Sequence, residues 1–104
     1  MAYIFDMDQA LVLDRLKSHE AELRHMGIAS LSVFGSTARG EAGASSDVDL
    51  AATFSAEAGV GMFAFSTIAA RLRELVGVPV DLVGEPARKQ SLQSEIDRDR
   101  LLVF

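Results

Sequence analysis

Two aspartates separated by one residue, Asp47 and Asp49, stand at the head of an apolar run. A first apolar run ends at Gly35-Ser36, and ten residues separate this pair from Asp47. Carboxylates supply the hard oxygen ligands that divalent cations prefer. A glycine lets backbone N–H groups approach an anion closely, and a serine at a helix start adds a hydroxyl donor. Together these residue types indicate a site for a phosphate group and its cation, which is a nucleotide site.

A third aspartate, Asp81, lies in a later apolar segment. Because side chains alternate between the two faces of a strand, we expect Asp81 on the same face of a sheet as Asp47 and Asp49. An isolated Asp-x-Asp is more typical of capping at a loop-to-strand junction, since short motifs arise often by chance. Three carboxylates on one face repel each other unless a cation lies among them. The combination with Gly35-Ser36 therefore favours a metal site.

Hydrophobic periodicity predicts the elements that must hold these residues. In the first helix, His19 falls on the apolar stripe, where we expect a packed, hydrogen-bonded histidine and not a metal ligand. The element order predicts an α+β fold in two layers, a small mixed sheet with helices packed on one face. Strands are expected at residues 28–34, 47–54, 78–83 and 101–104, and helices at residues 6–26, 36–40, 86–97 and in a segment that ends at 76.

Composition limits the class of protein and its partners. The 104 residues predict a single domain over residues 1–104, and the absence of cysteine excludes disulfides and thiolate metal sites. With a net charge of −5 and ten scattered basic residues, a long polynucleotide is not expected as a direct partner. There is no secretory signal and no apolar stretch of membrane-spanning length, so we expect a cytoplasmic protein without a membrane partner.

These motifs resemble those of a known family. Gly-Ser followed by ten residues and Asp-x-Asp resembles the signature of the DNA polymerase β-like nucleotidyltransferase superfamily. The fuller strings are similar to those of the minimal nucleotidyltransferases, and the resemblance extends over nearly the whole chain. These strings are Phe34-Gly35-Ser36-x-Ala38-Arg39-Gly40, Ser46-Asp47-Val48-Asp49-Leu50 and Val80-Asp81-Leu82-Val83.

The resemblance implies the nucleotidyltransferase fold and a role for each residue of the motif. Asp47 and Asp49 would bind two magnesium ions that hold the triphosphate of ATP. Asp81 would complete this catalytic metal site and help to deprotonate the attacking hydroxyl. Gly35 and Ser36 would contact the β- and γ-phosphates.

Arg39 is a further nucleotide-binding candidate, with two alternatives open. The resemblance implies that it balances charge on the departing pyrophosphate. An arginine in a polar loop is equally typical of an ordinary surface residue.

Minimal nucleotidyltransferases also imply a partner, because they act as antitoxins of HEPN-domain ribonuclease toxins. They transfer AMP from ATP to a tyrosine of the toxin. An acidic chain suits a partner whose surface is basic because it binds RNA. Two alternatives remain open: an antitoxin that neutralises its toxin by binding alone, and a transferase that acts on a small molecule such as an antibiotic. The second needs an acceptor pocket that 104 residues hardly provide unless an oligomer builds it.

Overall fold

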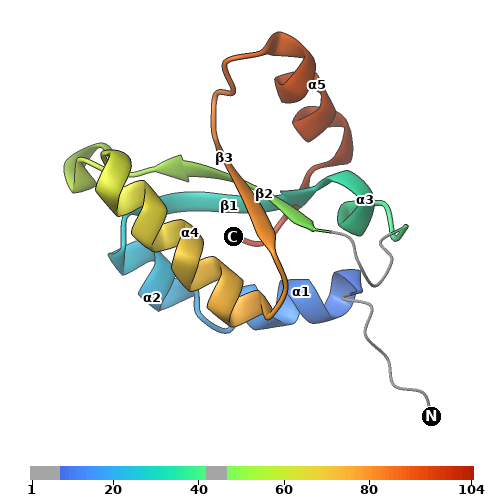
Figure 1. The fold of residues 1–104 in the computed structure, drawn as a ribbon, viewed down its shortest axis with the longest axis horizontal. Helices are drawn as coiled ribbons and strands as arrows, with labels where there is room; N and C mark the ends of the chain where they lie inside the picture. Colours follow the sequence, from blue (N-terminus) through green and yellow to red (C-terminus); the bar gives the residue numbers. More distant parts are fainter. Residues whose placement is uncertain (1–7, 42–46) are drawn as a thin grey trace.

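The computed structural model describes residues 8–41 and 47–104, and its elements follow the predicted order (Figure 1). Helix α3 follows directly on strand β1, and a short 3-10 turn η1 follows strand β2. The helices are α1 (Gln9–Lys17), α2 (Glu20–His25), α3 (Gly35–Ala38), α4 (Met62–Val76) and α5 (Gln90–Asp99), with η1 at Ala56–Ala58. The strands are β1 (Ile28–Phe34), β2 (Val48–Phe54), β3 (Val80–Gly84) and β4 (Leu101–Leu102).

The four strands form one mixed sheet in the order β3-β2-β1-β4. Strand β1 is antiparallel to both β2 and β4, whereas β2 and β3 run parallel. Because a parallel pair needs a crossover connection, α4 lies between β2 and β3 in the chain. Strand β3 is an edge strand, which accommodates Pro79 just before it, since proline lacks the N–H that a central strand would need.

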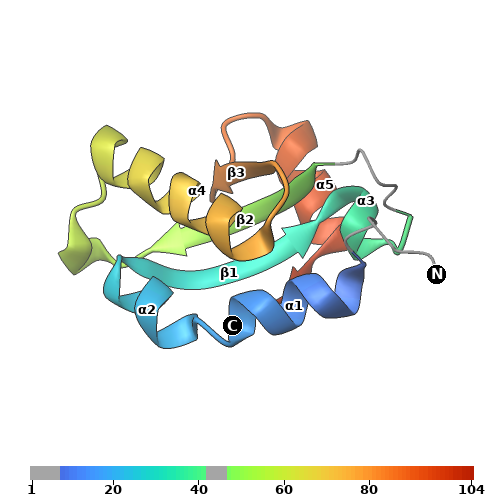
Figure 2. The ribbon, with the colours of Figure 1, turned by 60° about the horizontal axis from the view of Figure 1, so that its bottom comes forward.

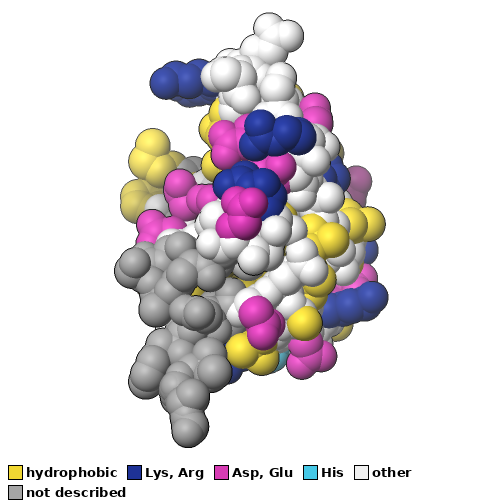
Figure 3. All heavy atoms as spheres, turned by 90° about the vertical axis from the view of Figure 1, so that its right-hand side faces the viewer, with side chains coloured by type: hydrophobic (Ala, Val, Ile, Leu, Met, Phe, Trp, Pro, Cys, Tyr) yellow, Lys and Arg dark blue, Asp and Glu magenta, His cyan; other side chains and the backbone are white. Residues whose placement is uncertain are grey.

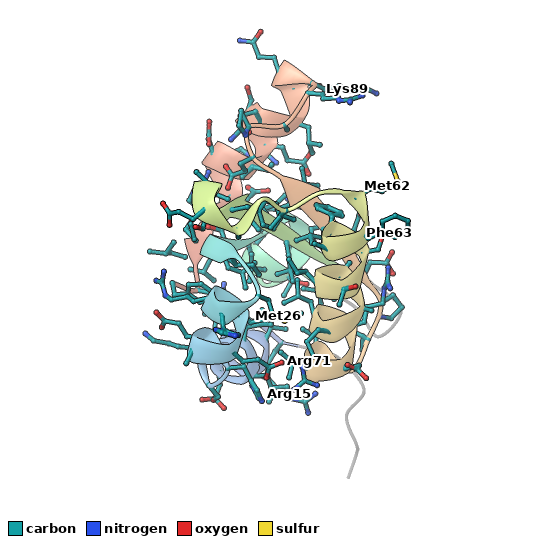
Figure 4. The ribbon with its side chains drawn as sticks, turned by 90° about the vertical axis from the view of Figure 1, so that its left-hand side faces the viewer. Arg15, Met26, Met62, Phe63, Arg71 and Lys89 are labelled. Atoms are coloured by element: carbon teal, nitrogen blue, oxygen red, sulfur yellow. The ribbon has the colours of Figure 1, made fainter. Side chains whose placement is uncertain are left out.

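Helices α1, α2 and α4 share one face of the sheet and enclose the main core (Figures 1 and 2). Leu16 and Leu72 from the helices pack there with Leu31 and Leu50 from the sheet, all four fully buried. Arg71 of α4 also donates two hydrogen bonds to the Glu22 carboxylate of α2. Figure 4 shows Arg71 where these helices meet, at the end of α4 away from Met62. This layer confirms the predicted α+β class.

The last helix differs from the prediction, because α5 lies on the opposite face of the sheet from the other long helices. Its Ile96 is fully buried against Phe34 of β1 and Ala51 of β2, whose side chains point away from the main core. Residues adjacent to them in the strands, Val33 and Leu50, belong to the main core. Strands that are apolar on both faces require cover on both faces. Helix α5 supplies that cover at one end of the sheet (Figure 1).

The first predicted helix, at residues 6–26, is two helices with a break at Ser18 and His19. The Ser18 hydroxyl and N–H both donate to the Asp14 carbonyl, and His19 leaves the helical region with φ −113° and ψ 21°. Short polar side chains compete in this way for helix backbone groups. His19 is partly buried and bonded to the Arg15 carbonyl, so its expected role as a packed histidine is confirmed. The predicted start of this helix at residue 6 lies outside the described residues, and Asp8 caps α1.

Candidate active site

The Gly35-Ser36 pair lies where β1 turns into α3, and Gly35 has the backbone angle that the turn needs. Its φ is +75°, in the left-handed region that side chains disfavour. A Cβ atom on Gly35 would lie 2.3 Å from Oδ2 of Asp49, well inside van der Waals contact. The carboxylate of Asp49 thus occupies the space that any other residue at position 35 would fill. The two halves of the predicted motif meet in space.

The parallel pairing of β2 and β3 places Asp49 and Asp81 directly beside each other. They are register partners, Asp49↔Asp81, so their side chains leave adjacent strands on the same face. That face is the one covered farther along by α5, because Ala51, two residues after Asp49, contacts Ile96. Asp49 is half-buried and Asp81 is exposed. The prediction that these two aspartates share a face is confirmed.

Asp47 immediately precedes β2 and is exposed at the end of the same row. Among residues 8–41 and 47–104, no three acidic or histidine side chains already surround a common point that could hold a metal ion. Mg²⁺ is usually bound through one or two carboxylates together with substrate phosphates and water, not in an all-protein cage. The hard oxygen donors at Asp47, Asp49 and Asp81 fit such an ion, which the nucleotide would bring with it.

The surroundings of Asp49 make its negative charge unfavourable in the metal-free protein. Burial, and then the nearby carboxylates of Asp81, Glu95 and Asp47, raise its pKa to about 6, while Arg39 acts in the opposite direction. A carboxylate held among like charges gains from a cation, because the cation cancels both the repulsion and the loss of hydration. The electrostatics therefore favour binding of a divalent ion beside Asp49.

Magnesium binding is expected to weaken as the pH falls through about 6, the pKa of Asp49. A ligand must be deprotonated, so below that pH each unit costs up to about tenfold in affinity, and above it the affinity levels off. Calorimetric titration of Mg²⁺ with ATP between pH 5 and 8 measures this, and Asp49→Asn should reduce the dependence to the part that comes from protonation of ATP itself. Equal affinity at pH 5 and pH 7 in the wild type would contradict Asp49 as a ligand.

Helix α3 presents Ser36 and Arg39 next to this row of carboxylates. Ser36 is partly exposed, directly after Gly35. Arg39 follows the helix and donates from Nη1 to Oδ2 of Asp99 (2.7 Å) and from Nε to Oε1 of Glu41 (2.9 Å). Figure 3, which faces the side of the molecule where α3 and α5 lie, shows basic and acidic side chains interleaved there. Contact of Ser36 and Arg39 with phosphate stays a prediction.

Sequence reasoning missed the residues that α5 adds to the site. Glu95 contributes a further negative charge near Asp49, and Asp99 binds Arg39. The available signal was the apolar character of Phe34 and Ala51 on the face that carries the aspartates, since apolar residues there need a cover. Thr37 was also unforeseen: its hydroxyl is buried and has no hydrogen-bond partner in the part of the chain described.

The sequence pattern of the nucleotidyltransferase domain family matches residues 15–103, and the chain belongs to this family. It is 35% identical over 89 residues to the protein adenylyltransferase MntA of Thermococcus cleftensis, covering 85% of this chain and 88% of the relative. A solved structure described as a minimal nucleotidyltransferase is 30% identical and superposes with a TM-score of 0.76, covering 90% of this chain and 94% of that one. These matches confirm the resemblance to minimal nucleotidyltransferases.

A more distant likeness concerns the fold alone. The complex of a tri-AMPylated Shewanella oneidensis HEPN toxin with its MNT antitoxin contains a chain that is 18% identical. It superposes with a TM-score of 0.63 over 92% of this chain and 71% of that one. Among the described residues of our chain, no helix is long and apolar enough to cross a membrane.

Proposed function

We propose that this chain is a magnesium-dependent adenylyltransferase that transfers AMP from ATP to a tyrosine hydroxyl of a HEPN ribonuclease toxin, and that it acts as the antitoxin of that toxin. The observation that carries the proposal is the approach of Asp49 to Gly35 on one side and to Asp81 on the other. The turn at Gly35 suits the binding of a phosphate, and the two aspartates suit the binding of the cation that accompanies it. The relative named protein adenylyltransferase supports a protein as the acceptor. The fold shared with the antitoxin of the AMPylated toxin complex is the reason for choosing a HEPN toxin as that protein.

In the proposed reaction the acceptor oxygen forms a bond to the α-phosphorus of ATP, and the bond from that phosphorus to the β-phosphate oxygen breaks. Pyrophosphate leaves with the electron pair of the broken bond, and the hydroxyl proton passes to a carboxylate and then to water. When bound, two Mg²⁺ ions would neutralise charge on the phosphates and on the entering and leaving oxygens. The protein contributes positioning and fixed electrostatics.

Each motif residue has a distinct task in this scheme. Asp47 and Asp49 would hold the metal ions, and Gly35 and Ser36 would fix the β- and γ-phosphates. Asp81 lies beside Asp49 on the edge strand and is exposed, so it can reach a hydroxyl that arrives from outside the domain. It is therefore the carboxylate that we assign to the acceptor proton.

The test is intact mass spectrometry of the partner toxin after incubation with ATP, Mg²⁺ and the purified chain. Adducts of AMP are expected with the wild type. Asp47→Asn should lower the rate of modification by at least about 100-fold, because the metal ions that balance the phosphate charge lose a ligand. Asp14→Asn removes the same charge from an exposed position of α1 and should leave the rate unchanged.

The same experiment separates the proposal from its alternatives. A toxin that stays unmodified but is still neutralised and co-purifies with the chain would contradict catalysis and support an antitoxin that acts by binding. An unmodified, unbound toxin together with AMP transfer to a small hydroxyl compound would support the small-molecule transferase.

A further inference from the structure

We propose that Asp99, the last residue of α5, is a positioning residue for the triphosphate: it holds the guanidinium of Arg39 at the end of α3, where Arg39 acts on the phosphates. The inference rests on the proposed function, because it assumes that ATP binds at the Gly35 turn. It adds a residue that lies outside the motif and far along the chain from it.

The contacts of Asp99 are those of a residue that holds a cation in place. Its side chain is only 4% exposed, which is rare for an aspartate unless it is paired. Oδ2 accepts from Nη1 of Arg39 (2.7 Å), and Oδ1 accepts from Nε of Arg98 (2.9 Å). Hydrogen bonds from Arg98 and Arg39 lower the pKa of Asp99 to about 2, so the carboxylate is ionised wherever the enzyme would work.

Arg39 is the link between this carboxylate and the phosphate turn. Its backbone N–H donates to the Gly35 carbonyl (3.1 Å), which closes the short helix that begins at the turn. The guanidinium is held at Nη1 by Asp99 and at Nε by Glu41. Its charge also acts on Asp49, whose pKa it lowers. A planar guanidinium fixed at this place is suited to phosphate oxygens, since it presents several donors in one fork.

Simple electrostatics and the positioning role predict opposite signs for the removal of Asp99. A negative charge near a triphosphate site repels ATP, so Asp99→Asn should strengthen binding if charge alone mattered. If Asp99 acts by fixing Arg39, the same substitution should weaken binding, because Arg39 must then be ordered by the ligand. The sign of the change therefore separates the two roles.

The experiment compares the binding of ATP and AMP, both with Mg²⁺, to the full chain. Calorimetry measures ATP, and NMR titration reaches the millimolar affinities expected for AMP. Asp99→Asn is expected to weaken ATP binding roughly tenfold and to leave AMP unchanged, because AMP lacks the β- and γ-phosphates. Arg39→Gln should weaken ATP binding at least as much, and the double variant should be no weaker than Arg39→Gln alone. Asp97→Asn, an exposed carboxylate of the same helix, serves as the matched control and should change ATP affinity less than twofold.

Several results would overturn the inference. One is an ATP affinity that is unchanged or increased in Asp99→Asn, and another is an equal loss of affinity for ATP and for AMP in that variant. The third is a double variant in which the losses of ATP affinity from Asp99→Asn and Arg39→Gln add. If Asp99→Asn folds poorly, Asp99→Glu keeps the charge but displaces it by one methylene, and it should show the same loss for ATP alone. A wild-type chain that binds no ATP would contradict the proposed function itself, whereas binding that Asp99 does not affect would contradict only this inference.

Discussion

Replacing Asp49 with asparagine is expected to abolish AMP transfer and at the same time to make the metal-free protein more stable. The rate should fall by about 1,000-fold, because the ion loses a ligand beside the phosphate turn. The folded protein should become more stable, because the negative charge that is removed is unfavourable there. Burial disfavours it, and so does repulsion from the carboxylates of Asp81, Glu95 and Asp47. After allowance for solvent at this half-buried group, the gain is of order 1 kcal/mol, or about 4–8 °C in Tm.

The dependence of this gain on pH provides the control. The pKa of Asp49 is about 6 in the folded state and 3.8 in the reference state, so the folded protein holds more protons between these values. The charge therefore destabilises the metal-free fold increasingly as the pH rises from about 4 to 6, and fully above that. The difference in Tm between Asp49→Asn and the wild type should accordingly be larger at pH 7 than at pH 4.5. An Asp49→Asn protein that is less stable than the wild type at pH 7 without metal would contradict this account.

Gly35→Ala is expected to disable the site and to destabilise the fold. The new methyl group would lie 2.3 Å from Oδ2 of Asp49, so either the turn or the carboxylate must move. The left-handed backbone at φ +75° adds about 1–2 kcal/mol of strain for any residue with a side chain. We expect AMP transfer to fall by at least about 100-fold, since a displacement of about 1 Å in a positioned group costs this much.

Gly59→Ala provides the matched comparison for this prediction. Gly59 also has a left-handed backbone, with φ +58°, but a Cβ there would meet no atom within 4 Å. Its strain alone should lower Tm by less than in Gly35→Ala, where the collision adds to it, and transfer activity should stay normal. Thermal unfolding and initial rates measured on both variants separate the strain from the collision. Normal activity in Gly35→Ala would show that Asp49 does not need the space beside residue 35.

Local patterns in the sequence predicted the first two strands closely, whereas β3 begins two residues later than expected and β4 has only two of its four expected residues. Strand β1 has the predicted bounds, and β2 begins one residue later than expected. Both results follow from clear local signals, since Gly35 ends one apolar run and the aspartates begin the other. The first helix was less predictable, because the break at Ser18 depends on how a serine hydroxyl competes for a helix carbonyl.

The features of the candidate site that depend on a single stretch of sequence were predictable. Alternation along a strand gives the face on which an aspartate lies, but not which residue of a neighbouring strand lies opposite. The pairing of Asp49 with Asp81 is fixed by the tertiary register of two parallel strands. Helix α5 packs on the face of the sheet where it buries Phe34 and Ala51, and this packing brings Asp99 to Arg39. The contact between Arg39 and Asp99 could therefore not be derived from the motif.

The order of the strands has a consequence for how activity arises during folding. Strands β1 and β2 form an antiparallel pair between neighbours in the chain, so Gly35 and Asp49 meet through a short loop closure. Asp81 follows α4 in the chain, so its approach closes a longer loop, and Arg39 meets Asp99 across 60 positions of sequence. Contacts between distant positions form late, because chain entropy must be lost before they are gained. We therefore expect the Gly35 turn and Asp49 to come together before Asp81 and the Arg39–Asp99 pair complete the site, so that AMP transfer depends on the last contacts to form.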